Sequence, residues 1–556
     1  MTAARTYIQV LLPVKLRWFP TYGTSIPLEP GRRVCVELGK RRYDGVVWRT
    51  LERPDLPPER IQDIVAVQDE LPAVTPEELR FWEFLAGYYL CTPGEVYKAA
   101  YPLLKLRSEQ TAADILARLH ARLAKKEEQL AGRHNEHVLA RLTAERNALR
   151  AEIAGYEQPV IRRLDSSVIR RPDSSVIRRL DRRISPKPLV LTSVNRRESY
   201  FPAVREMLTA GRQVLVLTSE IAFCDRLEAL FAPEFSAQLQ VFHSGKTPVQ
   251  RRGADERLRR GLPTLILGTR SALFLPFRDL GLVIVDEEQD PAYKQTEPAP
   301  RYHGRDAAIA LAGIHGARVL LGAAVPSLET LLNIRLGKYT LAEGGSSSAG
   351  LTSPSFAGLT GESPAEVIDL AAERRKNGIV GTFSRKLIDA ILQTDGPVLL
   401  IRGWEKVEPL QEEIARLFPE RNIRISTLNA LKREGAPGVA LLAVLQADAL
   451  VSRDDFRADE RAAQLVGTLE QFAPRVIVQT AVPARFNGSR SADDLLEERR
   501  QFGFPPYTRL VEIRRQGSGA VLDRQFLPRD RELADRKAAL LDTLPAGTYP
   551  DVDPID

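Results

Sequence analysis

Cysteine is scarce in this chain, and long apolar runs are missing. The three cysteines among 556 residues, Cys35, Cys91 and Cys224, lie far apart and form no Cys-x-x-Cys pair. They can build neither a disulfide framework nor a local tetrahedral zinc site, so we expect reduced thiols and no zinc. No apolar run approaches the roughly 18 residues of a membrane-spanning helix, and no signal segment opens the sequence. We therefore expect a soluble cytoplasmic protein with no membrane partner.

The charge balance is mildly basic. The chain has 79 Lys and Arg against 72 Asp and Glu, a net charge of +7. This charge permits a polyanionic partner such as nucleic acid but does not establish one. The length exceeds the size at which a single core keeps growing, so we expect roughly two to four domains.

The N-terminal part combines strand-like and helical patterns. The runs Ile8–Val14 and Gly45–Trp48 predict a small β domain. Thr75 precedes Pro76-Glu77-Glu78, which is typical of a helix N-cap. We interpret the aromatic residues of the helix that follows as core, in preference to a base-stacking surface. These aromatic residues are Phe81, Trp82, Phe84, Tyr88 and Tyr89.

Two segments follow that have unusual periodicity. Leucines between about 112 and 155 recur at helical spacing with Lys and Arg between them, which predicts a helical hairpin turning near Gly132. Residues 160–183 repeat Val-Ile-Arg-Arg with a period of eight residues. This repeat is too short for a solenoid. We interpret it as a basic, partly disordered linker, with phosphate contact as the functional alternative.

From residue 189 to about 335, short apolar runs alternate with helical patterns, and a weaker version follows from about 380 to 480. Such alternation predicts parallel sheets covered by helices. A Gly/Ser-rich piece at 344–363 separates the two stretches. The expected strands are Leu189–Leu191, Val214–Leu217, Thr264–Leu267, Leu282–Val285, Val319–Leu321, Val398–Ile401, Val439–Leu445 and Val476–Val478.

Asp286 and Glu287 directly follow the apolar run Leu282–Val285. A carboxylate at the carboxyl end of a buried strand can organise Mg²⁺, and a second one can polarise an attacking water. Both residues are therefore candidate catalytic groups. The structural alternative is a cap on the helix that follows.

An ordered series of motifs surrounds this pair. It comprises Gly268–Phe274, Asp286–Gln289, Tyr293–Gln295, Arg301–Asp306 and Leu321–Thr330, with further matching segments at Leu12–Val14, Pro30–Val34, Gly87–Val96, Glu497–Tyr507 and Asp551–Pro554. The series resembles the primosomal protein N′ family of replication-restart helicases.

The resemblance implies an α/β fold in which a small β DNA-binding domain precedes two RecA-like lobes, the second truncated. The implied divisions are a DNA-binding domain at 1–105, a helical hairpin and basic linker at 106–188, lobe one at 189–343, a Gly/Ser linker at 344–379, a degenerate lobe two at 380–482 and a truncated C-terminal domain at 483–556.

The resemblance also implies DNA contacts. The run Lys40-Arg41-Arg42 is the favoured phosphate contact, with a solvated charge run as the alternative. Pro20 and Thr21 stand where the family has the aromatic and aspartate of its pocket for a DNA 3′ end. The complete set of implied contacts is Tyr22, Gly39, Lys40, Arg41, Arg42, Arg270, Lys294 and Arg305.

Several motor elements depart from the family pattern. A phosphate-binding loop needs glycines and a lysine, but Ser193–Tyr200 has neither. The DEEH motif reads Asp286–Gln289, and Gly-Ser-Ala-Thr reads Gly322–Val325. Val466–Phe472 lacks the arginine fingers, which are worth about 10³ to 10⁵ in rate. The zinc-binding cysteine insertion is missing after Arg402-Gly403-Trp404. We therefore expect neither ATP, nor Mg²⁺, nor zinc to be bound.

The sequence leaves three functional hypotheses. The leading one is a DNA-binding replication-restart protein that recognises stalled or branched forks without helicase activity. Its expected partners are branched, single-stranded or duplex DNA, primosome and helicase-loading proteins, and single-stranded DNA-binding protein. The second is an ATP-dependent 3′–5′ DNA helicase of the primosome, which would use ATP and Mg²⁺. The third is a decayed reading frame without function.

Overall fold

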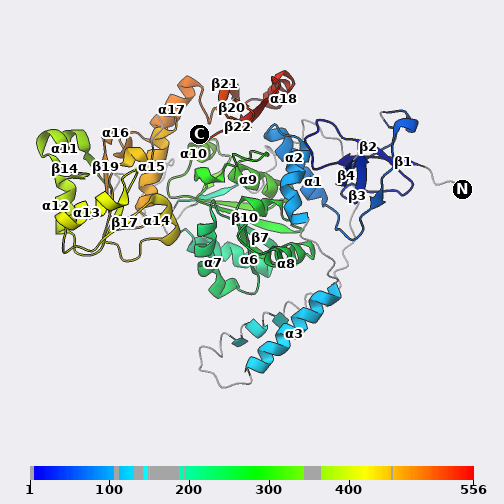
Figure 1. Ribbon diagram of the computed structural model, residues 1–556, viewed down its shortest axis with the longest axis horizontal. Helices are drawn as coiled ribbons and strands as arrows, with labels where there is room; N and C mark the ends of the chain where they lie inside the picture. The colour runs from blue at the N-terminus through cyan, green and yellow to red at the C-terminus, as the bar shows by residue number, and fades with distance from the viewer. Residues whose placement is uncertain are drawn as a thin grey trace.

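The computed structural model describes residues 5–39, 41–54, 56–104, 112–130, 142–143, 145–147, 149–150, 187–192, 196–342, 365–451 and 455–555. The chain has an α/β fold with a small antiparallel N-terminal sheet and two parallel sheets, as predicted. Figure 1 shows the N-terminal sheet in blue, the first parallel sheet mostly in green and the second in yellow to orange. None of the helices in this described part is long and apolar enough to cross a membrane.

The N-terminal sheet has five strands in the order β2-β1-β4-β3-β5. Two helices follow the sheet, and the first, α1, begins as the sequence predicts. Thr75 and Glu78 form a reciprocal capping box, in which the Glu78 amide donates to Thr75 Oγ1 at 3.1 Å. The elements are β1 (Thr6–Leu11), β2 (Thr21–Thr24), β3 (Arg33–Leu38), β4 (Arg41–Leu51), β5 (Ala66–Val67), α1 (Pro76–Tyr88) and α2 (Pro93–Leu104).

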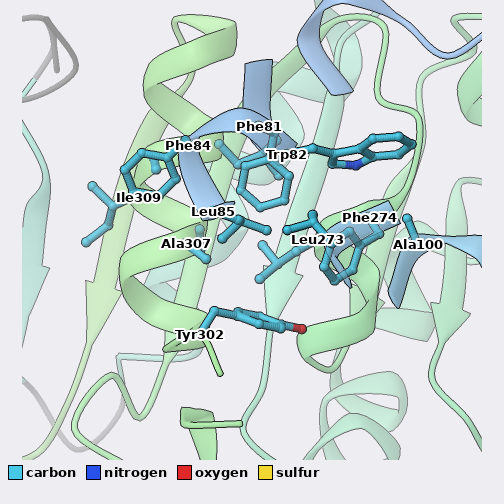
Figure 2. Close-up of a cluster of buried hydrophobic side chains, with 14 of the residues drawn as sticks. Phe81, Trp82, Phe84, Leu85, Ala100, Leu273, Phe274, Tyr302, Ala307 and Ile309 are labelled. Atoms are coloured by element: carbon cyan, nitrogen blue, oxygen red, sulfur yellow. The ribbon is translucent and has the colours of Figure 1, made fainter. Parts of the chain in front are cut away.

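Helix α1 packs against the first parallel-sheet lobe. Figure 2 shows Phe81, Trp82 and Leu85 of α1 beside Phe274 and Tyr302. Phe81 and Trp82 are buried, and the rings of Phe81 and Phe274 lie 6.0 Å apart. The interpretation of these aromatic residues as core is confirmed. Their burial joins the N-terminal domain to the lobe that carries Asp286 and Glu287.

The first parallel sheet and its helices, here called lobe 1, have the strand order β12-β6-β11-β10-β7-β9-β8. Strand β10 lies inside the sheet between β11 and β7, and all of its residues are buried. The strands are β6 (Leu189–Leu191), β7 (Gln213–Leu217), β8 (Leu239–Phe242), β9 (Leu265–Gly268), β10 (Leu280–Asp286), β11 (Arg318–Gly322) and β12 (Thr340–Leu341). The helices are α6 (Phe201–Thr209), α7 (Ile221–Phe235), α8 (Pro248–Arg259), α9 (Gly304–His315) and α10 (Leu328–Arg335).

The second parallel sheet and its helices, here called lobe 2, have the strand order β13-β19-β18-β16-β17. The strands are β13 (Glu366–Asp369), β16 (Val398–Ile401), β17 (Ile423–Ser426), β18 (Leu441–Val444) and β19 (Arg475–Thr480). The helices are α11 (Leu370–Lys376), α12 (Arg385–Gln393), α13 (Val407–Leu417), α14 (Leu428–Glu434), α15 (Ala458–Leu469) and α16 (Pro483–Phe486). The small hairpin of β14 (Ile379–Val380) and β15 (Phe383–Ser384) precedes α12.

A three-stranded antiparallel sheet, here called the C-terminal sheet, completes the described chain. Its strand order is β21-β20-β22, and β21 forms an edge. The elements are α17 (Ala492–Phe502), β20 (Thr508–Arg515), β21 (Val521–Pro528), α18 (Leu533–Thr543) and β22 (Thr548–Val552).

The eight predicted strands of the two lobes are all present, with ends shifted by a few residues. Strand β13 lies inside the range 344–379 that we predicted as linker. Its short Val367-Ile368 core gives little apolar pattern, yet it pairs in parallel with β19. Helix α3 (Ala112–Leu130) forms the first arm of the predicted hairpin. Gly132, the repeat at 160–183 and the piece at 344–363 lie outside the described residues.

Candidate functional site

The two candidate catalytic carboxylates lie at the carboxyl edge of the lobe 1 sheet. Strand β10 ends at Asp286, and Glu287 follows with a left-handed backbone, φ 53°. Such a conformation costs a non-glycine residue about 1–3 kcal/mol and marks positions that the surrounding structure holds in place. In open parallel sheets, this edge is where ligands bind.

Arginine side chains cover both carboxylates. Arg196 Nη2 donates to Glu287 Oε1, and Arg196 Nε lies 3.3 Å from Asp286 Oδ1. Arg197 Nε donates to Asp286 Oδ2 at 2.8 Å, and Arg197 Nη2 donates to Glu287 Oε1 at 3.1 Å. Two cations thus face two anions. We call the side chains that cover the two carboxylates the arginine plug.

Tyr200 completes the arginine plug. Its hydroxyl donates to Asp286 Oδ1 at 2.9 Å, and its side chain is fully buried. A Cβ atom at Gly322 would collide with this hydroxyl, so glycine at that position lets Tyr200 reach the carboxylate. Gly322 is the first residue of the altered Gly-Ser-Ala-Thr motif.

Electrostatics keep the arginine plug charged and paired. Burial is the largest influence and raises the pKa of Asp286, but Arg196 and Arg197 together lower it more, so the net pKa is below the usual 3.8. Burial lowers the pKa of Arg196, but the charges of Asp286 and Glu287 outweigh it and leave the pKa raised. Asp286 is therefore an anion at neutral pH, neutralised by its own chain.

This arrangement does not fit a Mg²⁺-nucleotide. Mg²⁺ needs carboxylate oxygens and substrate phosphates around it in near-octahedral geometry. Both Asp286 oxygens and one Glu287 oxygen accept from the arginine plug. The remaining Glu287 oxygen, Oε2, accepts from Gln289 Nε2 at 2.8 Å.

The reading of Asp286 and Glu287 as helix caps is wrong. The next helical element is the short 3₁₀ helix η4 (Pro291–Tyr293), and its cap is Asp290, whose Oδ1 accepts from the Ala292 amide at 2.9 Å. Asp286 and Glu287 instead make the ion pairs of the arginine plug.

The arginine plug borders a cleft between the two lobes. Lobe 1 contributes Arg197 and Glu287, and lobe 2 contributes Arg461, Thr468 and Gln471. The cleft has a volume of about 140 Å³, below the roughly 300–1,000 Å³ of typical small-molecule pockets. Thr468 Oγ1 and Gln471 Nε2 donate to carbonyls of their own chain segment, within 2.7 and 3.3 Å. The stretch in which we expected no arginine fingers thus presents uncharged side chains to the cleft.

Direct contacts hold the lobes together across this cleft. Lys432 of α14 pairs with Asp290 at 3.1 Å, and the Leu328 amide donates to Glu460 Oε1 at 2.9 Å. A Cβ atom at Gly467 would collide with Val325, so the two lobes touch at the altered motif. The apolar contact at Val325 stands where the family has the threonine hydroxyl.

The predicted DNA contacts fall into two groups. Arg41 and Arg42 are exposed at the start of β4, next to the turn at Gly39, which has φ 64°. Lys40 lies outside the described residues. Tyr22 is buried, and its hydroxyl donates to the Glu37 carbonyl at 3.0 Å. The β3–β4 turn therefore presents accessible cations, whereas Tyr22 supports the sheet behind it.

The predicted contacts in lobe 1 are mostly enclosed. Lys294 is buried and donates to Asp551 at 2.7 Å. Arg305 is also buried and donates to Glu288 at 2.8 Å. Arg270 is partly exposed at the start of the 3₁₀ helix η3 (Arg270–Phe274). Lys294 and Arg305 are therefore bound by carboxylates and closed to a phosphate in this structure.

Sequence reasoning missed Arg196 and Arg197 as binding partners of the carboxylates. The available signal was two adjacent arginines where the phosphate-binding loop has its lysine. Among the described residues, no group of His, Cys, Asp and Glu is arranged to hold a metal ion. The expectation of a zinc-free protein stays a prediction.

Comparisons with known proteins find several similar chains. Residues 9–102 match the family model described as the 3′ DNA-binding domain of PriA. The replication restart protein PriA of Haemophilus influenzae is 26% identical, over 93% of this chain and 88% of that protein. PriA of Chlamydia pneumoniae is 36% identical over 36% of this chain and 26% of that protein. A solved structure of RecG bound to a three-way DNA junction covers 82% of this chain and 59% of that one, with 13% identity and a TM-score of 0.34. The chain is thus similar over most of its length to the replication restart protein PriA, and its N-terminal domain matches that family's 3′ DNA-binding domain.

Proposed function

We propose that this chain is a DNA-binding replication-restart protein that recognises stalled or branched forks without a nucleotide-driven motor. The observation that carries the proposal is the arginine plug, since Arg196 and Arg197 occupy the carboxylates that a motor would use for Mg²⁺. The match of residues 9–102 to a 3′ DNA-binding domain supports the DNA-binding half.

A nucleotide would have to displace Arg196 and Arg197 from the two carboxylates. Removing one partner from a buried ion pair costs about 3–5 kcal/mol, because the other charge stays buried and unpaired. Arg196 is fully buried, and Asp286 is 2% exposed. Opening the plug to admit Mg²⁺ and a triphosphate would thus weaken binding by roughly 10²- to 4 × 10³-fold.

The β3–β4 turn is the proposed DNA contact. Arg41 and Arg42 are exposed there, and Lys40 belongs to the same run. Cations on a solvent-facing turn can neutralise phosphates and release counterions. Lys40, Arg41 and Arg42 are the proposed phosphate contacts.

The proposed partners besides DNA are primosome and helicase-loading proteins and single-stranded DNA-binding protein. The two lobes are joined by the Lys432–Asp290 ion pair and by the contact of Glu460 with the start of α10. The joined lobes form the proposed binding surface for these partners. The protein would then act as a scaffold at the fork.

The ATP-dependent 3′–5′ helicase is the second candidate. Asp286 and Glu287 favour it, because they lie at the carboxyl edge of a parallel sheet and border a cleft between two lobes. It requires Arg196 and Arg197 to leave both carboxylates. A decayed reading frame, the third candidate, predicts no cooperative unfolding of the purified chain.

A titration of Mg-ATP into the protein, with and without a synthetic fork, tests the proposal. We expect fork binding by fluorescence anisotropy and no heat of Mg-ATP binding in either condition. Arg318→Met is a control for the loss of a lobe 1 arginine outside the plug. It removes an exposed ion pair with Glu206 in the same lobe and should behave as the wild type. Micromolar Mg-ATP binding to the wild-type chain would contradict the arginine-plug argument, and absent fork binding would contradict the DNA-binding half.

A further inference from the structure

Glu460 forms a buried joint where the two lobes meet. It lies on α15 of lobe 2 and is 8% exposed. Its Oε1 accepts from the Leu328 amide of lobe 1 at 2.9 Å, and its Oε2 accepts from Arg499 Nη2 of α17 at 2.6 Å. Arg499 is 2% exposed. One carboxylate of lobe 2 therefore bonds to both lobe 1 and α17, and we call Glu460 with these two donors the interlobe joint.

Helix α17 is also packed on lobe 1. It lies beside both α10 and α15 (Figure 1). Arg335 of α10 pairs with Asp493 in the first turn of α17. Removal of apolar side chains from water stabilises such a contact roughly in proportion to the area buried. The buried apolar cluster comprises Leu328, Leu331 and Leu332 of α10 with Ala492, Leu495 and Leu496 of α17. Helix α17 is thus fixed to lobe 1 by apolar contacts and to lobe 2 by Arg499.

Separation of the lobes would break a buried contact by either of two routes. If α17 stayed with lobe 1, the Arg499–Glu460 ion pair would open and separate two buried charges. If α17 stayed with lobe 2, the apolar cluster of α10 and α17 would be exposed to water. The hydrogen bond from the Leu328 amide to Glu460 would break in both cases. Buried charges and amides that lose a partner are unfavourable, so the interlobe joint opposes both movements.

A second contact joins the lobes at the cleft. Arg226 Nη1 of α7 donates to the Lys432 carbonyl of α14 at 3.1 Å, and Lys432 Nζ pairs with Asp290. The guanidinium of Arg226 also lies 5.6 Å from the centre of the Phe472 ring of lobe 2. Lobe 1 therefore contacts α14 through both the backbone and the side chain of Lys432.

A third contact runs along the end of the described chain. Lys294 of lobe 1 donates to the Val552 carbonyl of β22 at 2.7 Å. Two residues later, the Pro554 carbonyl accepts from Arg457 Nη1 of lobe 2 at 2.9 Å. The segment Val552–Pro554 therefore links lobe 1 to lobe 2. Three separate points of contact restrict both the distance and the rotation between the two lobes.

We propose that these three contacts, here called the lobe lock, hold the two lobes in one arrangement when no ligand is bound. Where domains close around a ligand, the contacts of that ligand favour the closed form. In this chain, side chains and carbonyls of the protein itself make the contacts. The inference goes beyond the proposed function, because it concerns movement between the lobes and does not depend on DNA binding.

Hydrogen exchange of two neighbouring amides in the full-length chain tests the lobe lock. The Leu328 amide donates to Glu460 of lobe 2, whereas the Thr330 amide donates to Ser327 Oγ of its own lobe at 3.2 Å. Lobe separation would release the Leu328 amide but not that of Thr330, and fraying of α10 would release both. After correction for intrinsic rates, we expect equally slow exchange, measured by mass spectrometry with residue-resolved fragmentation. Exchange of Leu328 more than about tenfold faster than that of Thr330 would overturn the proposal.

Arg499→Met removes one partner of the interlobe joint and keeps most of the apolar volume. The loss of one charge-assisted hydrogen bond should raise the exchange rate of Leu328 by about 10- to 150-fold relative to that of Thr330. Arg475→Met is the matched control, because it removes an exposed ion pair with Glu366 in lobe 2 and should leave the ratio unchanged. A wild-type ratio in Arg499→Met would overturn the role of the interlobe joint.

A disulfide between the lobes tests the lobe lock even if Arg499→Met does not fold. A Cβ atom at Gly467 of lobe 2 would lie 3.6 Å from Cβ of Val325 in lobe 1, within the disulfide range of about 3.5–4.5 Å. The double variant Val325→Cys and Gly467→Cys should form this disulfide with diamide when no ligand is present, and its fork affinity should not change. Each single-cysteine variant is the control for the native thiols.

Incomplete disulfide formation, or fork binding that is lost on oxidation and restored by dithiothreitol, would overturn the lobe lock. Absent fork binding by the wild type would contradict the proposed function alone, since hydrogen exchange and disulfide formation need no DNA.

Discussion

Replacing Arg196 with methionine removes a guanidinium of the arginine plug while keeping most of its apolar volume. Arg196 is fully buried and pairs with both Asp286 and Glu287. Loss of one partner of a buried pair costs about 3–5 kcal/mol. Arg197 remains to neutralise part of the charge, so we expect a loss of about 3 kcal/mol in the free energy of unfolding of lobe 1. A domain of this size loses about 2–4 °C per kcal/mol, which gives about 6–12 °C.

Differential scanning calorimetry measures this shift, and two variants make it specific. Arg318→Met removes an exposed pair with Glu206 and should cost no more than about 1 kcal/mol. Adding Asp286→Asn to Arg196→Met should recover at least about 1 kcal/mol, since the unpaired anion is gone. The reasoning is refuted if Arg196→Met unfolds at the wild-type temperature, or if Asp286→Asn lowers the stability of the Arg196→Met protein further.

Three further predictions concern pH, salt and zinc. Burial lowers the pKa of Lys537 to about 7, so between pH 7 and its ordinary pKa of 10.5 the unfolded chain binds more protons than the folded one. The free energy of unfolding should therefore rise from pH 7 to pH 9 in urea titrations, and Lys537→Met should flatten that rise; a fall with pH would oppose the assignment. Duplex DNA affinity should drop with salt at a log–log slope of roughly −4 to −5, and replacing Lys40, Arg41 and Arg42 by Ala should flatten it by up to about 3; an unchanged slope would leave these residues as a solvated charge run. Chelator-treated protein should keep its fork affinity, and stoichiometric zinc by elemental analysis would disprove the expectation.

The sequence predicted the buried parts of the fold well, because apolar runs report burial directly. Leu282–Val285 gave the central strand β10, and Thr75 gave the start of α1. Strand β13 was missed, since Val367 and Ile368 alone make a weak pattern for an edge strand.

The candidate site was predicted only in part. The position of Asp286 at a strand end follows from local pattern, whereas its pairing with Arg196 joins residues about 90 positions apart in the chain. Lys294 and Arg305 were assigned to DNA because their motifs resemble those of the family. Sequence alone does not reveal that Asp551 and Glu288 enclose them. Long-range ion pairs depend on how the loops fold, and the amino-acid composition does not show which distant residues will pair.

The central claim is that the arginine plug replaces nucleotide at Asp286 and Glu287. Steady-state ATP turnover with fork DNA, for the wild type and Glu287→Gln, tests it most directly. The account predicts no helicase-like turnover from either protein, because the carboxylates are already neutralised and the cleft carries the uncharged Thr468 and Gln471 in the stretch where the resemblance places arginine fingers. Turnover that is unchanged by Glu287→Gln would point to a contaminating enzyme. Fork-stimulated turnover in the wild type that disappears in Glu287→Gln would contradict the account and establish the helicase.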